Sequence, residues 1–471
     1  MPNEREIVQR FLDHGLMAHP EVISYIKEQN NPALIDTITS GLPEGTVVVS
    51  PAHIPSAKPE RDGMRFLSDP VLEIIEGAAG TAGPSNLDDA SRYFRDRYDK
   101  LSSMVKARSP SMPIEALTKT PSRYMEQECG ITGIVSDKKT TKNGNIMVEL
   151  EDTSGNIRVL FSSKKTDLFR ESESILLDEV IGVKGSPSKD GMFFFAEQII
   201  RPDIPRNNAP YKSKEPGKAV FISDVHVGSN TFLEGEWNRF ADWLSDSDTS
   251  YLLIAGDLVD GIGIYPGQGD ELTIKNIDEQ YEVFASMVND LPMRMEIVIS
   301  PGNHDAIRGA EPQPALPERF TRFFPSNCTF VENPAMVSLQ GVRVLMYHGR
   351  SFDDMISMIP GASYERSTDV MVEMLKRRHL TPTYGRRTPI AASPTDRMVI
   401  SQIPEIFHAG HVHITGATDY RGVLCINTGT WQSQTSFQKQ MNITPTPAQA
   451  ISVDLQTLQF EILDFLEPPS G

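Results

Sequence analysis

The chain has 471 residues, of which 39% are hydrophobic, and a formal net charge of −18 at pH 7. This length accommodates two or three domains, and the acidic charge argues against holding nucleic acid through a general basic field. Only three cysteines occur, without a CxxC pair, so neither a disulfide framework nor a thiolate zinc site is indicated. The charged amino terminus lacks a signal-peptide pattern, and no apolar run reaches the roughly 20 residues that cross a bilayer, so we expect a cytoplasmic protein.

Residues 1–75 are predicted to form a small helical module. Apolar residues recur at intervals of three and four in EREIVQRFLDHGLM and PEVISYIKEQ, with glycine and proline at the breaks. Residues 76–115 follow as a flexible linker that begins with a stretch rich in Gly, Ala and Ser. One charged helix is expected within it, in ASRYFRDRYDKLSSMVKAR.

In residues 116–205 the apolar pattern changes to a period of two. The turn signals NG and SGN separate alternating runs, and two further runs, DEVIGVKGSPS and GMFFFAEQII, have the length of additional strands. This spacing predicts a five-stranded OB-like barrel, and another kind of strand meander is the alternative. Phe193–Phe195 and the lysines Lys138, Lys139 and Lys142 are candidate DNA contacts, but core packing and an exposed charged face are their default interpretations.

Residues 206–471 are predicted to form an α/β domain. After a proline-rich connector, short buried strand-like runs alternate with helical and loop segments, as in a sandwich of sheets covered by helices. The runs are KAVFISDVHVG, YLLIAGDLVDG, EIVISPGNHD, VRVLMYHGR, EIFHAGHVH and VLCINTGTW. Six of the ten histidines of the chain lie in them.

Polar side chains follow five of these runs at the points where the predicted strands end. They are Asp224, His226, Asp257, Asn303, His304, His348, His411 and His413. Because strand ends converge on one edge of such a sheet, and neighbouring glycines let the backbone approach closely, we expect one dense cluster of oxygen and nitrogen ligands. On an extended chain, Asp224 and His226 would point the same way, as would His411 and His413.

The motif set DxH, GDxxD, GNHD, HG and GHxH resembles that of the calcineurin-like metallophosphoesterases. The resemblance implies a four-layer β-sandwich flanked by helices that binds two divalent ions. Carried over position by position, the first ion would be held by Asp224, His226 and His413. Asp257 would bridge both ions, and the second would be completed by Asn303, His348 and His411. Mixed carboxylate, amide and imidazole ligation suits Mn²⁺, with Fe, Zn or Ni as alternatives.

The same resemblance implies hydrolysis of a phosphoester. Two divalent ions lower the pKa of a shared water and clamp the oxygens of a phosphoryl group for in-line attack. His304 would be the catalytic residue that protonates the leaving oxygen, and a hydrogen bond behind the ligands is its alternative role. Asp260 and Asp305 are expected to contact the metal ligands and orient them, without binding an ion themselves. Asp260 stands where related nucleases often have a histidine, so transition-state details of those nucleases are not transferred.

The order of the predicted segments resembles that of the small subunits of archaeal family-D DNA polymerases. This order is a helical amino terminus, a linker, an OB-like barrel and a phosphoesterase domain. Local runs support the resemblance over residues 116–471, among them GIVSDKKTTKNGNIMVELED, LIAGDLVDGIGIYPGQ, YHGRSFDDMI and GTWQSQTSFQKQMN. It implies a DNA replication protein at the nucleoid that carries a Mn²⁺-dependent 3′–5′ exonuclease for proofreading. Its partners would be a large catalytic polymerase subunit and single-stranded or primer–template DNA.

Three arginines are candidate contacts to substrate phosphates. Arg350 directly follows the HG histidine, and Arg377 and Arg378 lie in the basic stretch EMLKRRHLTPTYGRR. An ion pair with Asp353 or Asp354 is the alternative for Arg350, and a solvated helix and loop is the alternative for the basic stretch. Two other functions stay open: a stand-alone enzyme acting on small phosphoesters, and a polymerase assembly subunit without catalysis.

Overall fold

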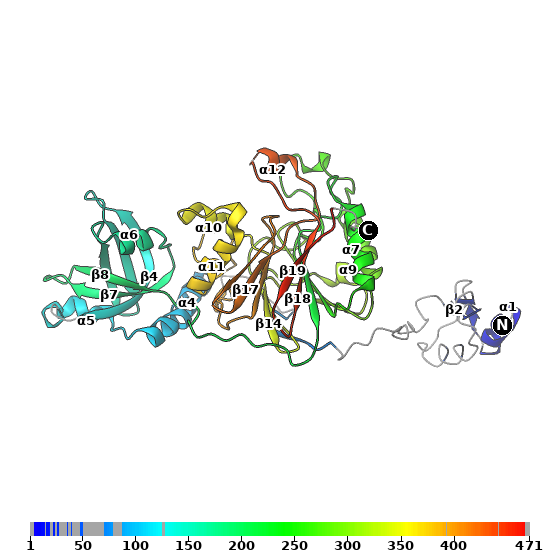
Figure 1. The fold of residues 1–471 in the computed structure, drawn as a ribbon, viewed down its shortest axis with the longest axis horizontal. Helices are drawn as coiled ribbons and strands as arrows, with labels where there is room; N and C mark the ends of the chain where they lie inside the picture. The colour runs from blue at the N-terminus through cyan, green and yellow to red at the C-terminus, as the bar shows by residue number, and fades with distance from the viewer. Residues whose placement is uncertain are drawn as a thin grey trace. The chain divides into compact units, whose positions relative to one another are not determined.

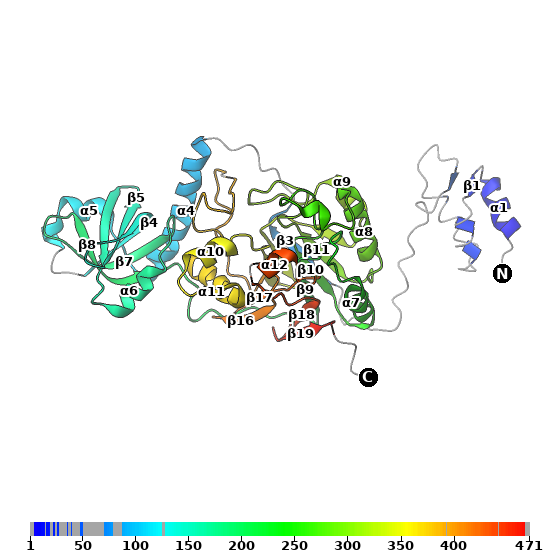
Figure 2. The same ribbon diagram turned by 90° about the horizontal axis from the view of Figure 1, so that it is seen from above.

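The fold is known from a computed structural model (Figures 1 and 2). It describes residues 4–14, 16–18, 22–23, 26–27, 35, 39, 48–49, 70–78, 87–124, 128–391, 393–440 and 442–466. The chain divides into two compact units, Met1–Arg65 and Phe66–Gly471. Among the described helices, none has the length and apolar character that a membrane span requires.

The first unit contains helix α1 (Glu4–Asp13) and a parallel pair of two-residue strands, β1 (Met17–Ala18) and β2 (Val48–Val49). Ile7 and Phe11 lie four residues apart on α1 and are buried in a small apolar cluster. The helix therefore lies where the apolar period predicts one. Of the second predicted helix, PEVISYIKEQ, only residues 22–23 and 26–27 are described.

In the second unit, helices α4 (Leu87–Arg108) and α5 (Ile114–Lys119) precede a closed five-stranded barrel. The barrel strands are β4 (Cys129–Thr140), β5 (Ile146–Asp152), β6 (Gly155–Phe161), β7 (Val180–Pro187) and β8 (Phe193–Ile200). They pair in the order β4-β5-β6-β8-β7, and β7 returns to β4. The predicted OB-like barrel is thus confirmed, and helix α6 (Thr166–Glu173), between β6 and β7, is an addition to it.

The three neighbouring phenylalanines of β8 follow the alternation of a barrel strand. Phe194 is fully buried in the barrel core, whereas Phe195 points outward with 43% of its surface exposed. Lys138, one of the candidate DNA contacts, instead donates from Nζ to Glu173 O (2.6 Å) and Ile175 O (2.8 Å), where α6 ends. Its ammonium group therefore ties α6 to β4.

Residues 218–464 form a sandwich of two six-stranded sheets, one of which also takes in a strand from before the barrel. The first has the order β12-β11-β10-β9-β18-β19, with strands β9 (Lys218–Ile222), β10 (Tyr251–Ala255), β11 (Glu296–Ser300), β12 (Cys328–Phe330), β18 (Gln449–Asp454) and β19 (Phe460–Asp464). The second has the order β16-β17-β15-β14-β13-β3, with strands β3 (Leu72–Glu76), β13 (Ala335–Leu339), β14 (Val342–Met346), β15 (Ile406–Ala409), β16 (Gly416–Tyr420) and β17 (Val423–Asn427). The central strands run parallel in each sheet, so their carboxyl ends share an edge.

Helices cover the outer faces of both sheets. Figures 1 and 2 show α7 (Glu234–Asp246), α8 (Ile277–Asn289) and α9 (Glu318–Thr321) on one side, and α10 (Phe352–Met358) and α11 (Ser367–Arg377) on the other. A short helix, α12 (Ser436–Gln440), precedes β18. Alternate residues of β9 serve two cores: Phe221 packs between the sheets, and Ile222 packs toward the helices. The predicted four-layer architecture is confirmed.

Residues 72–76 form strand β3, whereas the sequence places 72–75 in the helical module and Glu76 in the linker. This strand pairs antiparallel with β13 at the edge of the second sheet. The run LEIIE is too short to show a period of its own, and the strand that receives it lies far along the chain. Long-range pairing therefore decides its conformation.

Buried ion pairs join α4 and the barrel to the sandwich. Arg97 of α4 has no exposed surface, and its Nε lies 2.7 Å from Asp396 Oδ2. Glu179, at the start of β7, accepts a hydrogen bond from Arg201 Nε (2.7 Å) and another from Arg377 Nε (3.3 Å). Separating such a pair would leave an unpaired buried charge, which strongly destabilises the fold. Each of these pairs therefore holds its elements in one arrangement.

We expect Arg97→Ala to lower the free energy of unfolding of this region by about 3–5 kcal/mol, because Asp396 would lose its guanidinium partner in a buried site. Arg366→Ala is the matched control, since Arg366 pairs with Asp369 at 3.4 Å and its side chain is 61% exposed. That exposed pair should contribute less than about 1 kcal/mol. Urea unfolding followed by tryptophan fluorescence measures both, and equal midpoints would contradict the structural role of Arg97.

Candidate metal centre

The residues predicted as metal ligands meet at the carboxyl ends of neighbouring strands. Asp224 and His226 follow β9, Asp257 follows β10 and Asn303 follows β11. From the second sheet, His348 follows β14, and His411 and His413 follow β15. Among the residues that the structure describes, three groups have ligand atoms within 4.8 Å of one another: Asp224, His226 and His413; Asp257, His348 and His411; and His226, Asp260 and His304.

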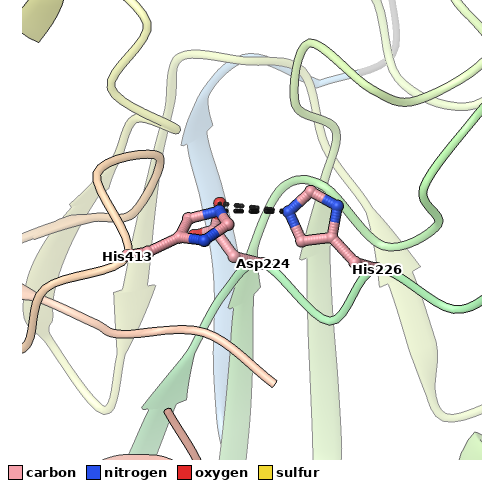
Figure 3. A group of neighbouring side chains, drawn as sticks. All are labelled: Asp224, His226 and His413. Carbon is pink, nitrogen blue, oxygen red and sulfur yellow. Dashed lines mark hydrogen bonds and ion pairs between the residues drawn. The ribbon is translucent and has the colours of Figure 1, made fainter. Parts of the chain in front are cut away.

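In the first group, two imidazoles face one carboxylate oxygen (Figure 3). Asp224 Oδ1 lies 3.3 Å from His413 Nε2 and 3.8 Å from His226 Nε2, and these two nitrogens are 3.1 Å apart. Asp224 Oδ1 is buried and accepts no hydrogen bond from the described residues. A buried carboxylate oxygen without a donor, facing two ring nitrogens, fits a set of ligands for a cation.

In the second group, His348 Nε2 lies 3.3 Å from Asp257 Oδ2 and 3.1 Å from Asn303 Oδ1. Asp257 Oδ2 also lies 3.8 Å from His226 Nε2, which belongs to the first group. This carboxylate therefore faces both groups. The position matches the bridging role that the family resemblance implies for Asp257.

Both carboxylates are held in their ionised forms. Burial alone would raise the pKa of Asp224, but the neighbouring His413 and His226 lower it below its usual range. Burial likewise opposes the charge of Asp257, and His348 brings the pKa of this group well below the ordinary value for aspartate. Both groups are therefore anionic near neutral pH, as cation ligands must be.

The backbone brings these side chains together in an unusual way. Five of the seven predicted ligands have left-handed backbone conformations, with φ of 52° at Asp224, 54° at His226, 50° at Asp257, 71° at His411 and 60° at His413. Such φ values are uncommon outside glycine and cluster at functional sites. The expectation that alternation along an extended chain aligns Asp224 with His226 is wrong, because both residues have left-handed backbone conformations.

The backbone beside Asp257 lies so close to its carboxylate that only a glycine fits there. A β carbon on Gly302 would lie 2.2 Å from Asp257 Oδ1. Asp257 Oδ1 accepts a hydrogen bond from the backbone N of His304 at 2.8 Å. Only glycine at position 302 therefore allows the GNHD loop to lie against the carboxylate of Asp257.

Asp260 supports a predicted ligand, as its sequence position suggests. Its Oδ1 lies 3.1 Å from His226 Nδ1, and its carboxylate accepts hydrogen bonds from Gln268 Nε2 (3.0 Å) and Gln432 Nε2 (3.1 Å). A carboxylate on the far nitrogen fixes the ring orientation and tautomer, which leaves Nε2 for a metal ion.

We expect Asp260→Ala to weaken Mn²⁺ binding by roughly 10- to 100-fold, because His226 would lose the partner that orients it. Isothermal titration with Mn²⁺ measures the change. Asp270→Ala is the control, since Asp270 lies in the same segment and belongs to none of the three ligand groups. Equal affinities of the two variants would contradict this supporting role.

Asp305 stabilises the GNHD loop through hydrogen bonds. Its Oδ2 accepts from Gly302 N (2.8 Å) and its Oδ1 from Tyr281 Oη (2.9 Å). Burial, reinforced by the charge of Asp257, raises the pKa of Asp305 to about 7. The residue thus supports the loop and belongs to none of the three ligand groups.

Other supporting residues were not found from the sequence. Asp353 Oδ2 lies 3.3 Å from His411 Nε2, and Tyr364 Oη donates to Asp353 Oδ1 at 2.8 Å. Gln438 Nε2 lies 2.7 Å from His413 Nδ1. For Asp353, the only signal in the sequence is its position five residues after His348, at the start of α10. From the sequence, Asp353 is expected only as an alternative ion-pair partner of Arg350.

His304 lies beside the first group with its ring partly exposed. The ring centroids of His304 and His226 are 4.8 Å apart, and His304 Nδ1 lies 2.8 Å from Asp260 O. Because a carbonyl oxygen only accepts hydrogen bonds, Nδ1 carries a proton. Nε2 is then the atom through which His304 would act on a substrate.

Of the three arginines proposed as phosphate contacts, only Arg350 lies near the ligand groups with a partly exposed side chain. Its Nη1 donates to Gly309 O at 2.7 Å, in the loop that follows GNHD. It pairs with neither Asp353 nor Asp354 among the described contacts. The contacts of the described residues thus leave Arg350 as the remaining candidate of the three.

The prediction that Arg377 and Arg378 bind DNA is wrong, because both guanidinium groups are buried. Arg377 is 1% exposed and bonds to Glu179 and Glu373. Arg378 is 4% exposed and donates to the carbonyl oxygens of Ile400 (2.8 Å) and Ser401 (2.8 Å). Both arginines are structural, and the first of them helps to hold the barrel.

Comparison with known proteins agrees with this architecture. A family model of the B subunits of DNA polymerases alpha and epsilon matches residues 219–415, and a model of an OB-fold nucleic acid binding domain matches residues 130–200. A solved structure described as a novel archaeal phosphodiesterase covers 52% of this chain and 98% of its own, with 12% identity and a TM-score of 0.29. That structural likeness is too weak to support a conclusion about fold or function.

Relatives align over most of the chain. The DNA polymerase II small subunit of Methanothermobacter thermautotrophicus is 41% identical over 94% of this chain and 96% of its own length. The proteins of the same name from Archaeoglobus fulgidus and Halobacterium salinarum are 42% and 40% identical, over 80% and 86% of this chain and 77% and 81% of their own lengths.

The helix-flanked sandwich, with histidines and carboxylates gathered at its strand ends and an OB barrel before it, defines a class of α/β sandwich proteins that carry an OB domain. Within this class the alignments are specific. The chain belongs to the archaeal DNA polymerase II small subunits, the small subunits of family-D DNA polymerases.

Proposed function

We propose that the protein is the proofreading subunit of a heteromeric DNA polymerase and removes nucleotides from DNA 3′ ends by two-metal hydrolysis. The observation that carries the proposal is the buried Oδ1 of Asp224, which has two imidazole nitrogens beside it and no hydrogen-bond donor among the described residues. A subunit that served assembly alone would have no need of this arrangement. Mn²⁺ is the ion that we expect, since the ligands combine carboxylate, amide and imidazole groups.

Asp224, His226 and His413 would hold one ion, Asn303, His348 and His411 the other, and Asp257 would face both. Bound there, the ions would activate the attacking water and offset charge on the phosphoryl oxygens. Asp260 and Asp353 keep their imidazole partners in fixed orientations.

Two residues of the chain would act on the DNA directly. In its doubly protonated form, His304 would deliver the Nε2 proton to the 3′ oxygen as it leaves and keep the Nδ1 proton on Asp260 O. Arg350 would orient the scissile phosphate or its neighbour with a guanidinium fork.

The partners of the subunit would be DNA and a large catalytic polymerase subunit. The OB barrel supports a DNA contact because OB folds commonly bind single strands. The exposed ring of Phe195 is one candidate for stacking. Such a subunit would work in the cytoplasm at the nucleoid, and one chain would serve both assembly and hydrolysis.

Digestion of a 5′-labelled oligonucleotide tests the proposal. The oligonucleotide is offered as a single strand and as a primer with a mismatched 3′ end, in Mn²⁺ and in EDTA, with and without the large subunit. We expect a Mn²⁺-dependent ladder that shortens from the 3′ end. Intact DNA in every lane, with metal bound to the protein, would overturn the exonuclease assignment, and hydrolysis of small phosphoesters would then identify a different substrate.

A further inference from the structure

A short loop beside the metal centre exposes three apolar side chains. Ile262, Ile264 and Tyr265 have exposed fractions of 47%, 39% and 36%, and they begin two residues after Asp260. We call residues 261–267 the apolar loop. Neighbouring exposed apolar side chains at the edge of a reactive site indicate a contact surface.

Buried amide side chains fix the backbone of the apolar loop. Gln268 Nε2 donates to Asp260 O at 2.8 Å, and Gln268 Oε1 accepts from Ile264 N at 3.0 Å. Gln280 Oε1 accepts from Gly261 N at 2.9 Å, and its Nε2 donates to Gly261 O at 3.2 Å. The loop is therefore held at its start and at its middle while its apolar side chains stay exposed to solvent.

The apolar loop lies directly against the residue proposed to act on the leaving oxygen. A β carbon on Gly261 would lie only 2.3 Å from His304 O and 3.1 Å from Ile264 Cδ1. Gly261 also has a φ of 74°, which favours glycine. The loop thus runs along the His304 side of the centre, where the leaving group of a phosphodiester would lie.

We propose that the apolar loop is a stacking surface for the nucleobase on the retained side of the cleaved bond; this rests on the proposed exonuclease function. When hydrolysis releases a 5′-mononucleotide, the P–O3′ bond breaks, and the oxygen leaves with the nucleotide that stays on the strand. The base of that nucleotide would therefore meet Tyr265 and the two isoleucines. Stacking on ring and apolar surfaces is tolerant of sequence, because every base has a π-face.

This surface also gives a reason for a preference for frayed ends. The retained base can lie on protein only after it and the terminal base have both left the duplex, and a terminal mismatch lowers this cost because the terminal pair is already broken. The apolar loop would therefore favour mismatched 3′ ends over paired ones. Discrimination would come from the ease of unstacking, with no need to read the identity of the base.

The test compares two substrates for the full chain with its large subunit, in Mn²⁺. One is a 5′-labelled single-stranded oligonucleotide, and the other is bis(p-nitrophenyl) phosphate, which has no nucleobase. In the double variant Ile262→Ala/Ile264→Ala, and separately in Tyr265→Ala, we expect the ratio of kcat/KM for DNA to that for the small diester to fall by roughly 5- to 30-fold. Tyr265→Phe keeps the ring and should restore the ratio.

Ile462→Ala is a matched control, because Ile462 is 44% exposed but lies on strand β19, outside the apolar loop. Its ratio should equal that of the wild type. An unchanged ratio in the loop variants would overturn the stacking surface, as would equal losses on both substrates. Loss of the large subunit from the purified complex with an unchanged ratio would also overturn it, and would mark the loop as a protein contact.

Failure of the two proposals can be told apart. If the wild type hydrolyses the small diester but cleaves no DNA, with or without the large subunit, the exonuclease assignment fails. If the wild type shortens DNA and the loop variants do so with the same ratio, only the stacking surface fails.

Discussion

Asp257→Asn should lower Mn²⁺-dependent hydrolysis of DNA by about 10³-fold. The Oδ2 of Asp257 faces His226 and His348, one in each group of predicted ligands, at 3.8 Å and 3.3 Å. Its charge would be shared between two ions, and their electrostatic stabilisation of the transition state is worth several kcal/mol, at about 1.4 kcal/mol for each tenfold change in rate. Asparagine keeps the size of the side chain and an oxygen that can accept the hydrogen bond from His304 N.

Steady-state kinetics and metal titration together check this prediction. The variant should also bind fewer than two Mn²⁺ ions per chain. Asp248→Asn is a matched control, because the carboxylate of Asp248 is 62% exposed and pairs with Lys218 at 2.7 Å. Full activity in Asp257→Asn would refute the assignment of both ligand groups.

His304→Gln should lower kcat for DNA by roughly 10²- to 10⁴-fold, the range expected when a general acid is removed. Binding of Mn²⁺ should stay within about twofold of the wild type, because His304 belongs to neither proposed ion site. Glutamine retains a hydrogen-bonding group of similar reach, so Asp260 O keeps a donor nearby.

The contrast between kinetics and metal titration separates two roles for His304. Loss of activity together with loss of an ion would show that His304 is a ligand. Retention of kcat would show that its contact with Asp260 O is only structural. Normal unfolding of the variant in urea shows that the fold is intact in either case.

Much of the domain architecture could be predicted because it depends on local patterns. The barrel strands alternate with a period of two and turn at glycine, so β4, β5 and β6 are readable from residues that lie side by side in the chain. The clustering of the predicted ligands could also be expected, since each follows a short buried run that ends in a polar residue. In these cases the signal and the structure lie within about ten residues of each other.

The features that the sequence did not predict depend on partners far along the chain. Arg377 reads as part of a basic surface stretch, but its partner Glu179 lies 198 residues away. Leu72–Glu76 becomes a strand only because β13 offers an edge. The left-handed conformations of Asp224 and His226 could not be predicted either, because aspartate and histidine adopt them only in a minority of cases.

The position of β3 makes the barrel an insertion within the sandwich domain. The second sheet takes its edge strand from before the barrel and all its other strands from after it. During synthesis, β3 must therefore wait for β13, while the barrel between them can already close on itself. A protein that began at residue 116 would leave the outer edge of β13 open to pairing with another chain. The segment around residues 72–76 is thus needed for a domain whose other strands all follow the barrel.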